Sequence, residues 1–240
     1  VLVGGSENSV FGDEIVLIGG KNNTASGQFV TLFAGENNNV TGTASAIVAG
    51  RQNDILNSDD SSIVAGNSND ITSSLRSSIS AGTGNKIDGS TNSVVVGGES
   101  NELLGSFNST IIAGTGNKVD IHSSRSLINA GHDNTIDSVD SLIGAGAFNF
   151  IDLGSKSAII AGQKNEIQNS DRSIIGAGSG NLINKSNNSL VGAADNSIIN
   201  INTDVIFTHT FSYSNQEIIK EIGFGSDFTK FPFTTLNQVS

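Results

Sequence analysis

A glycine recurs every 15 to 17 residues along most of this chain, and Gly or Ala precedes it each time. These repeat glycines fall at positions 5, 20, 35, 50, 66, 82, 98, 114, 131, 146, 162 and 178. An asparagine stands three positions after every one of them: Asn8, Asn23, Asn38, Asn53, Asn69, Asn85, Asn101, Asn117, Asn134, Asn149, Asn165 and Asn181. A fixed period of this kind indicates a repeat architecture in which each unit is one structural turn.

Two rows of aliphatic residues keep the same spacing. One lies three positions before each repeat glycine, from Leu2 to Ile175, and the other lies five positions after it, from Val10 to Ile183, with Ala25 as its small member. From Ser45 to Ser173 a serine also stands five positions before each glycine. Positions two apart share one face of a β-strand, so this alternation predicts two short strands in each repeat.

We therefore predict an all-β fold over residues 1–200: a thin parallel β-solenoid, or β-roll, of about 13 coils. Its interior should contain the two aliphatic rows, the serine row and the Gly or Ala before each repeat glycine, which would be small because the walls come close there. The asparagines should stack about 4.8 Å apart, so that their amides bond along a ladder as a structural element. The repeat glycines should supply turns with positive φ.

The other face of the first strand is predicted to point outward and to be apolar. Two positions before the glycine lie Val3, Ile18, Phe33, Val48, Val64, Val96, Ile112 and Ile160. Three of the four repeats without a large residue there carry one two positions earlier, namely Leu127, Leu142 and Ile174. A long apolar stripe on a soluble chain is typical of an interface, so we expect it to be buried in a homotrimer. The predicted inter-chain stripe comprises Val48, Val64, Val96, Ile112, Leu127, Leu142, Ile160 and Ile174.

The pattern Ser-x-Ile-x-Ala-Gly, with stretches such as Asn22-Asn23-Thr24-Ala25-Ser26-Gly27, resembles the left-handed β-roll repeats of trimeric autotransporter adhesin heads. It is also similar to Gly- and Asn-rich repeats of phage and viral tail fibres. The resemblance implies a trimeric fibre that lies outside the cell or on a virion and attaches to a host cell-surface glycan or protein receptor. It carries no catalytic motif, and we expect the chain not to be an enzyme.

The period ends near residue 200, and residues 201–240 differ in composition. This segment contains six of the 12 Phe residues, the one Tyr and the one Pro. The sequence Ser214-Asn215-Gln216-Glu217 fits a capping box, and Gly223 fits a helix stop, so one short helix is predicted over 214–223. The segment is interpreted as a cap of the solenoid, a binding tip, or a junction to a further fibre segment.

Composition restricts the function classes. The net charge of −11 argues against nucleic-acid binding, and no apolar run is long enough for membrane insertion in this segment. There is no cysteine, and His122, His132 and His209 have no metal-ligand spacing, so no metal or cofactor is expected. Two alternatives stay open: a tailspike-like glycan-degrading enzyme that uses carboxylates such as Asp59, Asp60 and Asp70, and an ice-binding solenoid.

Overall fold

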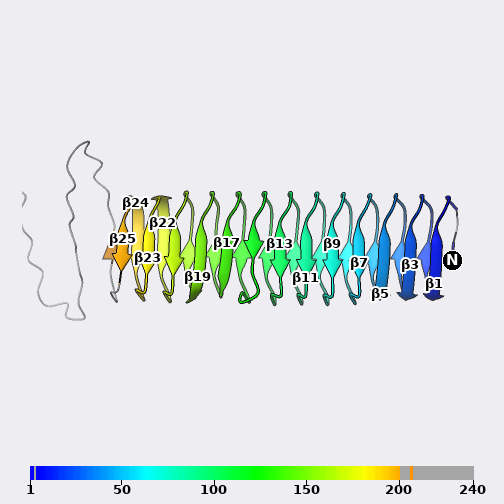
Figure 1. Ribbon diagram of the computed structural model, residues 1–240, viewed down its shortest axis with the longest axis horizontal. Coiled ribbons are helices and arrows are strands. Elements are labelled where there is room, and N and C mark those ends of the chain that lie inside the picture. Colours follow the sequence, from blue (N-terminus) through cyan, green and yellow to red (C-terminus); the bar gives the residue numbers. More distant parts are fainter. Residues whose placement is uncertain (3, 201–205, 208–240) are drawn as a thin grey trace, which may run out of the picture.

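The chain forms a straight parallel β-solenoid in which successive coils stack along one axis (Figure 1). A computed structural model describes residues 1–2, 4–200 and 206–207, and all regular secondary structure within them is β-strand. Two parallel sheets contain 13 strands each, which corresponds to about 12 complete turns. The predicted all-β parallel solenoid is therefore confirmed for the described residues, with about 12 turns where about 13 coils were predicted.

The strands alternate between the two sheets in chain order. The odd-numbered sheet contains β1 (Ser9–Asp13), β3 (Thr24–Gln28), β5 (Asn39–Thr43), β7 (Asp54–Leu56), β9 (Asp70–Thr72), β11 (Lys86–Asp88), β13 (Glu102–Leu104), β15 (Lys118–Val119), β17 (Thr135–Val139), β19 (Phe150–Ser155), β21 (Glu166–Gln168), β23 (Leu182–Asn184) and β25 (Ile198–Asn200). The even-numbered sheet contains β2 (Val16–Leu17), β4 (Thr31–Leu32), β6 (Ala46–Ile47), β8 (Ser62–Ile63), β10 (Ser78–Ile79), β12 (Val94–Val95), β14 (Thr110–Ile111), β16 (Leu127–Ile128), β18 (Leu142–Ile143), β20 (Ala158–Ile159), β22 (Ile174–Ser179), β24 (Leu190–Asp195) and β26 (Ile206–Phe207).

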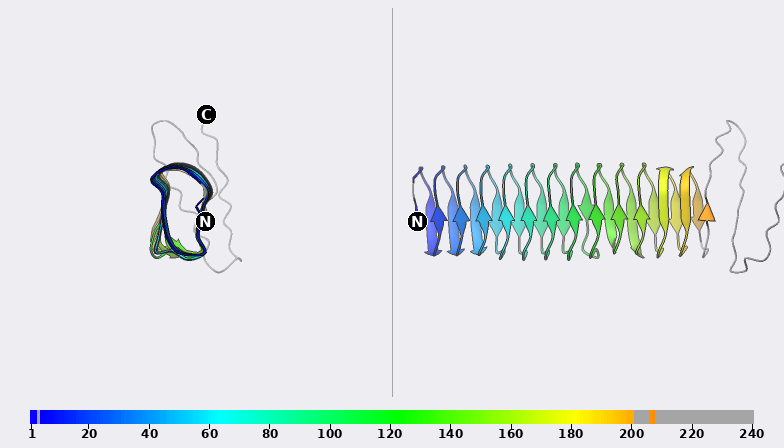
Figure 2. Two further views of the ribbon diagram at one scale, coloured as in Figure 1. Left: turned by 90° about the vertical axis from the view of Figure 1, so that its right-hand side faces the viewer. Right: turned by 180° about the vertical axis from the view of Figure 1, so that it is seen from behind.

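Two narrow sides connect the sheets, and Figure 2 shows the resulting closed coil from its end. Isolated parallel bridges link successive coils on both narrow sides, such as Thr83 to Glu99 on one and Thr91 to Phe107 on the other. The corners use residues with positive φ, including Asn92 (φ 53°) and Asn108 (φ 55°). Asparagine, aspartate and glycine tolerate this conformation better than other residues, and they occupy many of these corner positions.

The two aliphatic rows form the core, as predicted. Ile111 from the even-numbered sheet and Val119 from the odd-numbered sheet are fully buried, as are their equivalents in almost every coil. Each side chain packs on the equivalent residue one coil away, because the strands pair in register, for example Ile111 with Ile128. Burial of one such side chain stabilises the fold by about 1.5–3 kcal/mol.

The predicted place of the Gly or Ala row is wrong. These residues lie at the surface rather than between the walls: an added Cβ at Gly19 would meet nothing within 4 Å, and one at Gly97 would meet only the Ala81 carbonyl oxygen at 3.9 Å. The close approach instead occurs at the following glycine. A Cβ on Gly98 would overlap the carbonyl oxygen of Gly114 in the next coil.

A second buried serine row was missed by the sequence analysis. It comprises Ser58, Ser74, Ser90, Ser106, Ser123, Ser138, Ser170 and Ser186. The first coils are one residue shorter and carry Gly12, Gly27 and Gly42 near this corner instead. The sequence signal for this row is a serine eight positions before each repeat glycine from Gly66 onward. The coil of Gly162 is the exception, because Gly154 stands in place of the serine.

The predicted C-terminal region, residues 201–240, lies outside the described residues except for β26. The helix predicted over 214–223 lies wholly outside them. The proposed roles of this region as a cap, a tip or a junction therefore stay predictions. Within the described part of the chain, no helix has the length and apolar character needed to cross a membrane.

Candidate interaction faces

The predicted asparagine ladder is present, and its members from Asn23 onward are buried. In a typical coil, the Asn101 Nδ2 donates to Asn85 Oδ1 at 3.1 Å and to the carbonyl oxygens of Gly97 and Gly114 at 3.1 and 2.9 Å. Asn101 Oδ1 in turn accepts a hydrogen bond from the Asn117 backbone N–H at 3.0 Å. Each amide thus joins three successive coils and satisfies backbone groups that would otherwise be buried without partners.

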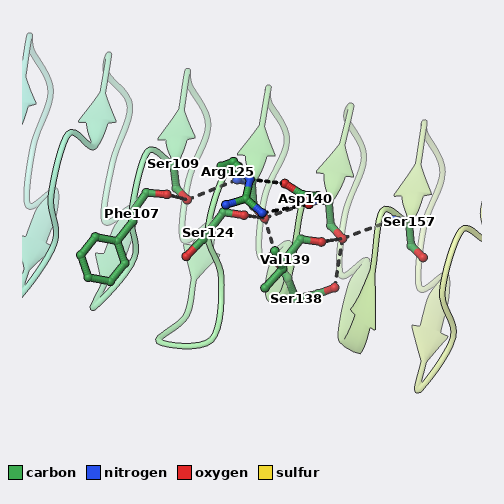
Figure 3. Close-up of polar contacts among 10 residues, drawn as sticks. Phe107, Ser109, Ser124, Arg125, Ser138, Val139, Asp140 and Ser157 are labelled. Atoms are coloured by element: carbon green, nitrogen blue, oxygen red, sulfur yellow. Dashed lines mark hydrogen bonds and ion pairs between the residues drawn. The ribbon is translucent and has the colours of Figure 1, made fainter.

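The serine rows likewise form hydrogen bonds between successive coils, on the opposite narrow side. Ser93 Oγ donates to the Ser106 carbonyl oxygen at 3.2 Å and accepts from the Ser109 backbone N–H at 3.4 Å. Figure 3 shows this ladder beside a surface ion pair, in which Arg125 Nη2 lies 3.0 Å from Asp140 Oδ2. Of the buried side-chain polar atoms in the described residues, two have no hydrogen-bond partner. Because almost all buried polar side-chain atoms are hydrogen-bonded, the interior holds adjacent coils in register and favours a stiff rod.

The outer face of the even-numbered sheet is formed by two columns of side chains. We call the residues two positions before the repeat glycine, and Gly192, the proximal column: Ile18, Phe33, Val48, Val64, Ser80, Val96, Ile112, Asn129, Gly144, Ile160, Gly176 and Gly192. The distal column lies two residues earlier: Val16, Thr31, Ala46, Ser62, Ser78, Val94, Thr110, Leu127, Leu142, Ala158, Ile174 and Leu190. Neither column contains a charged residue.

The predicted stripe is exposed on this face, as the alternation of side chains along the strand predicted. Val48, Val64, Val96, Ile112, Ile160 and Ile174 are between 37% and 47% exposed, and Leu127 and Leu142 are half-buried. Val3, a further member of the row, lies outside the described residues. Exposed apolar surface of this length on one face marks a candidate interaction site.

The outer face of the odd-numbered sheet has the opposite character. Its strands present Asp54, Asp70, Lys86, Asp88, Glu102, Lys118, Asp137, Asp152 and Glu166, and Asp120 directly follows β15. Ion pairs join some of them, such as Lys86 with Asp88 at 3.2 Å and Lys118 with Asp120 at 2.7 Å. Because exposed charges are costly to remove from water, this face is suited to solvent.

Two carboxyl groups on the odd-numbered face have raised pKa values. Partial burial raises the pKa of Asp54, and the neighbouring carboxylate of Asp70 raises it further. Burial likewise raises the pKa of Asp152, with a second contribution from Asp137. Both pairs are in-register neighbours on adjacent coils, so like charges are stacked along the axis.

We expect Asp54→Asn to stabilise the protein at pH 7 and to have no such effect below pH ~3.5. A raised folded-state pKa means that Asp54 contributes stability below its unfolded pKa of about 3.9 and loses it as the pH rises through the folded value. The urea midpoint of both proteins at the two pH values measures this. Equal midpoints at pH 7 would contradict the assignment.

The residues considered for other chemistry are dispersed. His122 Nδ1 lies 2.9 Å from Asp137 Oδ1, and His132 Nδ1 lies 3.2 Å from Asp133 Oδ2, both at the surface, whereas His209 lies outside the described residues. The Asp59 carboxylate accepts a hydrogen bond from the Thr43 backbone N–H on a narrow side. Among the described residues, no three His, Cys, Asp or Glu side chains are grouped to hold a metal ion.

Comparison with known proteins yields only distant likenesses. No protein-family model matches the chain, and no curated protein matches it. Among solved structures, it is similar to a candidate acetyltransferase from Desulfovibrio desulfuricans G20, with 5% identity and a TM-score of 0.21 over 87% of this chain and 68% of that one. It is also similar to the polySia-specific acetyltransferase NeuO, with 16% identity and a TM-score of 0.15 over 91% of each chain.

These findings correct one expectation. The chain was predicted not to be an enzyme, whereas both of these solved structures are named as acetyltransferases. We therefore do not retain the exclusion of enzymatic activity. At TM-scores of 0.21 and 0.15 the likeness assigns no activity to this chain either.

Proposed function

We propose that the chain is a shaft segment of a homotrimeric, extracellular fibre on a cell surface or a virion, with a structural and adhesive role. In this role the rod holds a binding element away from the surface, for attachment to a host glycan or protein receptor. The observation that carries the proposal is the uncharged apolar face that runs along a solenoid whose interior is bonded from coil to coil.

A second copy of the same chain is the partner that this face fits best. Another copy offers apolar columns with the same spacing of about 4.8 Å per coil, so side chains can interdigitate along the whole length. A partner with any other repeat would lose register after a few coils. The net charge of −11 also disfavours self-association through the charged face.

The size of the face is sufficient for a stable contact. About 12 turns at about 4.8 Å give a length of about 58 Å, and two side-chain columns are about 12 Å wide, so the face offers about 700 Å². Stable protein interfaces bury about 800 Å² on each partner. Side chains next to the two columns would supply the remainder.

The oligomeric state tests the proposal directly. One chain has a mass of 24.6 kDa, so a trimer has a mass of about 74 kDa, which light scattering distinguishes readily. A monomer at micromolar concentration would contradict the proposal.

Ile112→Asp is expected to abolish assembly, because it places a charge that cannot be paired at the centre of the buried face. The matched control is Asn108→Asp, which adds the same charge four residues earlier at an exposed corner of the same coil. We expect the first variant to elute as a monomer with unchanged circular dichroism, and the control to keep the wild-type mass. An Ile112→Asp protein that keeps the wild-type mass would exclude this face as the interface.

A further inference from the structure

The large apolar side chain changes column partway along the even-numbered face. From Ile18 to Ile112 every coil except that of Ser80 carries one in the proximal column, and the coils of Ile18 and Val96 add a valine, Val16 and Val94, in the distal column. From Leu127 to Leu190 the large apolar side chain lies in the distal column in four of five coils, and Ile160 is the exception. The apolar stripe therefore runs obliquely across the face instead of parallel to the solenoid axis.

This change is a property of the side chains and does not come from a shift of the strands. β14 and β16 pair in register across the point of change, with Thr110 opposite Leu127 and Ile111 opposite Ile128. In the end view the coils lie almost on top of one another, so the solenoid does not twist enough to realign the stripe (Figure 2). The oblique course therefore persists in three dimensions.

The change coincides with the longest coil. Seventeen residues separate Gly114 from Gly131, and the extra residue is accommodated in a turn at Ile121 and His122. That turn follows β15 of the odd-numbered sheet, away from the apolar face. The chain is thus divided at one place into two segments, each with its own apolar column.

We infer that a second copy of this chain contacts the proximal column up to Ile112 and the distal column from Leu127 onward, so that parallel copies wind around a common axis. This inference rests on the proposed homotrimer. A stripe that drifts across a rod imposes winding, as a drifting apolar stripe does in coiled coils. A step of two residues, about 6.7 Å, between segment centres about 29 Å apart corresponds to a tilt of about 13°.

Single cysteines provide the test, because the chain contains no cysteine. In parallel copies, identical positions beside the common axis form disulfides under mild oxidation, whereas positions away from it do not. Four variants of the full chain form two matched pairs: Val48→Cys against Ala46→Cys in the first segment, and Leu127→Cys against Asn129→Cys in the second. Thr72→Cys on the odd-numbered face is the negative control.

We expect covalent dimers on a non-reducing gel for Val48→Cys and Leu127→Cys, at least fivefold more than for their partners two residues away. Efficient linkage at Val48→Cys and Asn129→Cys would show straight copies and overturn the winding while leaving the trimer intact. Linkage at Thr72→Cys would overturn the parallel contact. So would a protein with the mass of a trimer in which none of the four cysteines links to its counterpart in another copy. A monomeric mass would instead overturn the proposed function itself.

Discussion

Gly98→Ala is expected to destabilise the solenoid by about 4 kcal/mol, the combined cost of overpacking and of a left-handed backbone conformation. Gly98 has a φ of 100°, which residues with a side chain rarely adopt. An added Cβ would overlap the Gly114 carbonyl oxygen in the next coil and lie 2.6 Å from Asn101 Nδ2. Urea unfolding followed by circular dichroism measures the loss.

The neighbouring residue provides the matched control. Gly97→Ala adds the same methyl group one position earlier, where the nearest atom is 3.9 Å away, and most coils already carry alanine at this place. We expect its urea midpoint to equal that of the wild type or to exceed it slightly, because alanine reduces the entropy of the unfolded chain. Equal losses for the two variants would show that the close approach at Gly98 does not control stability.

Asn101→Ala is expected to cost about 3–5 kcal/mol, because it leaves a buried backbone N–H without an acceptor and opens a cavity. The Asn117 N–H loses the Asn101 Oδ1, and the carbonyl oxygens of Gly97 and Gly114 lose the Asn101 Nδ2. The damage affects both neighbouring coils, so hydrogen exchange should rise on each side of the substitution. Native-state exchange read by mass spectrometry measures this together with the urea midpoint.

The control for the ladder is Asn129→Ala. Asn129 is exposed on the even-numbered face, outside the ladder, and its truncation is expected to change the stability of one chain by less than about 0.5 kcal/mol. If Asn101→Ala proved as mild as this control, the ladder would be a consequence of the fold and would contribute little to its stability.

Much of the fold follows from the repeat alone. The 15 to 17-residue spacing leaves room for two short strands in each coil, and strand parity then places Ile111 and Val119 inside and Ile112 outside. The ladder position of Asn101 follows from its invariant distance to the repeat glycine. The candidate face was predictable for the same reason, because its two columns follow from the alternation of side chains along each strand.

Other features could not be predicted because they depend on the direction of the chain at the corners. The alternation of inward and outward side chains was assumed to continue past the strand to Ala81 and Gly97. The backbone turns there instead and places these residues at the surface. Ser90 lies inside for the corresponding reason at another corner, where Gly89 has a φ of 59°. A period-two pattern has no meaning across residues with positive φ, since successive side chains no longer alternate.

The sequence by itself determined the period, the two core rows, the asparagine ladder and the uncharged outer face, because each depends on spacing within a strand or between equivalent coils. Only the tertiary structure decided why Gly98 must be glycine, which carboxylates are stacked as neighbours, and whether the coils superpose closely enough for the stripe to stay oblique. These depend on the separation and alignment of backbones from different coils, which contacts within one repeat do not specify.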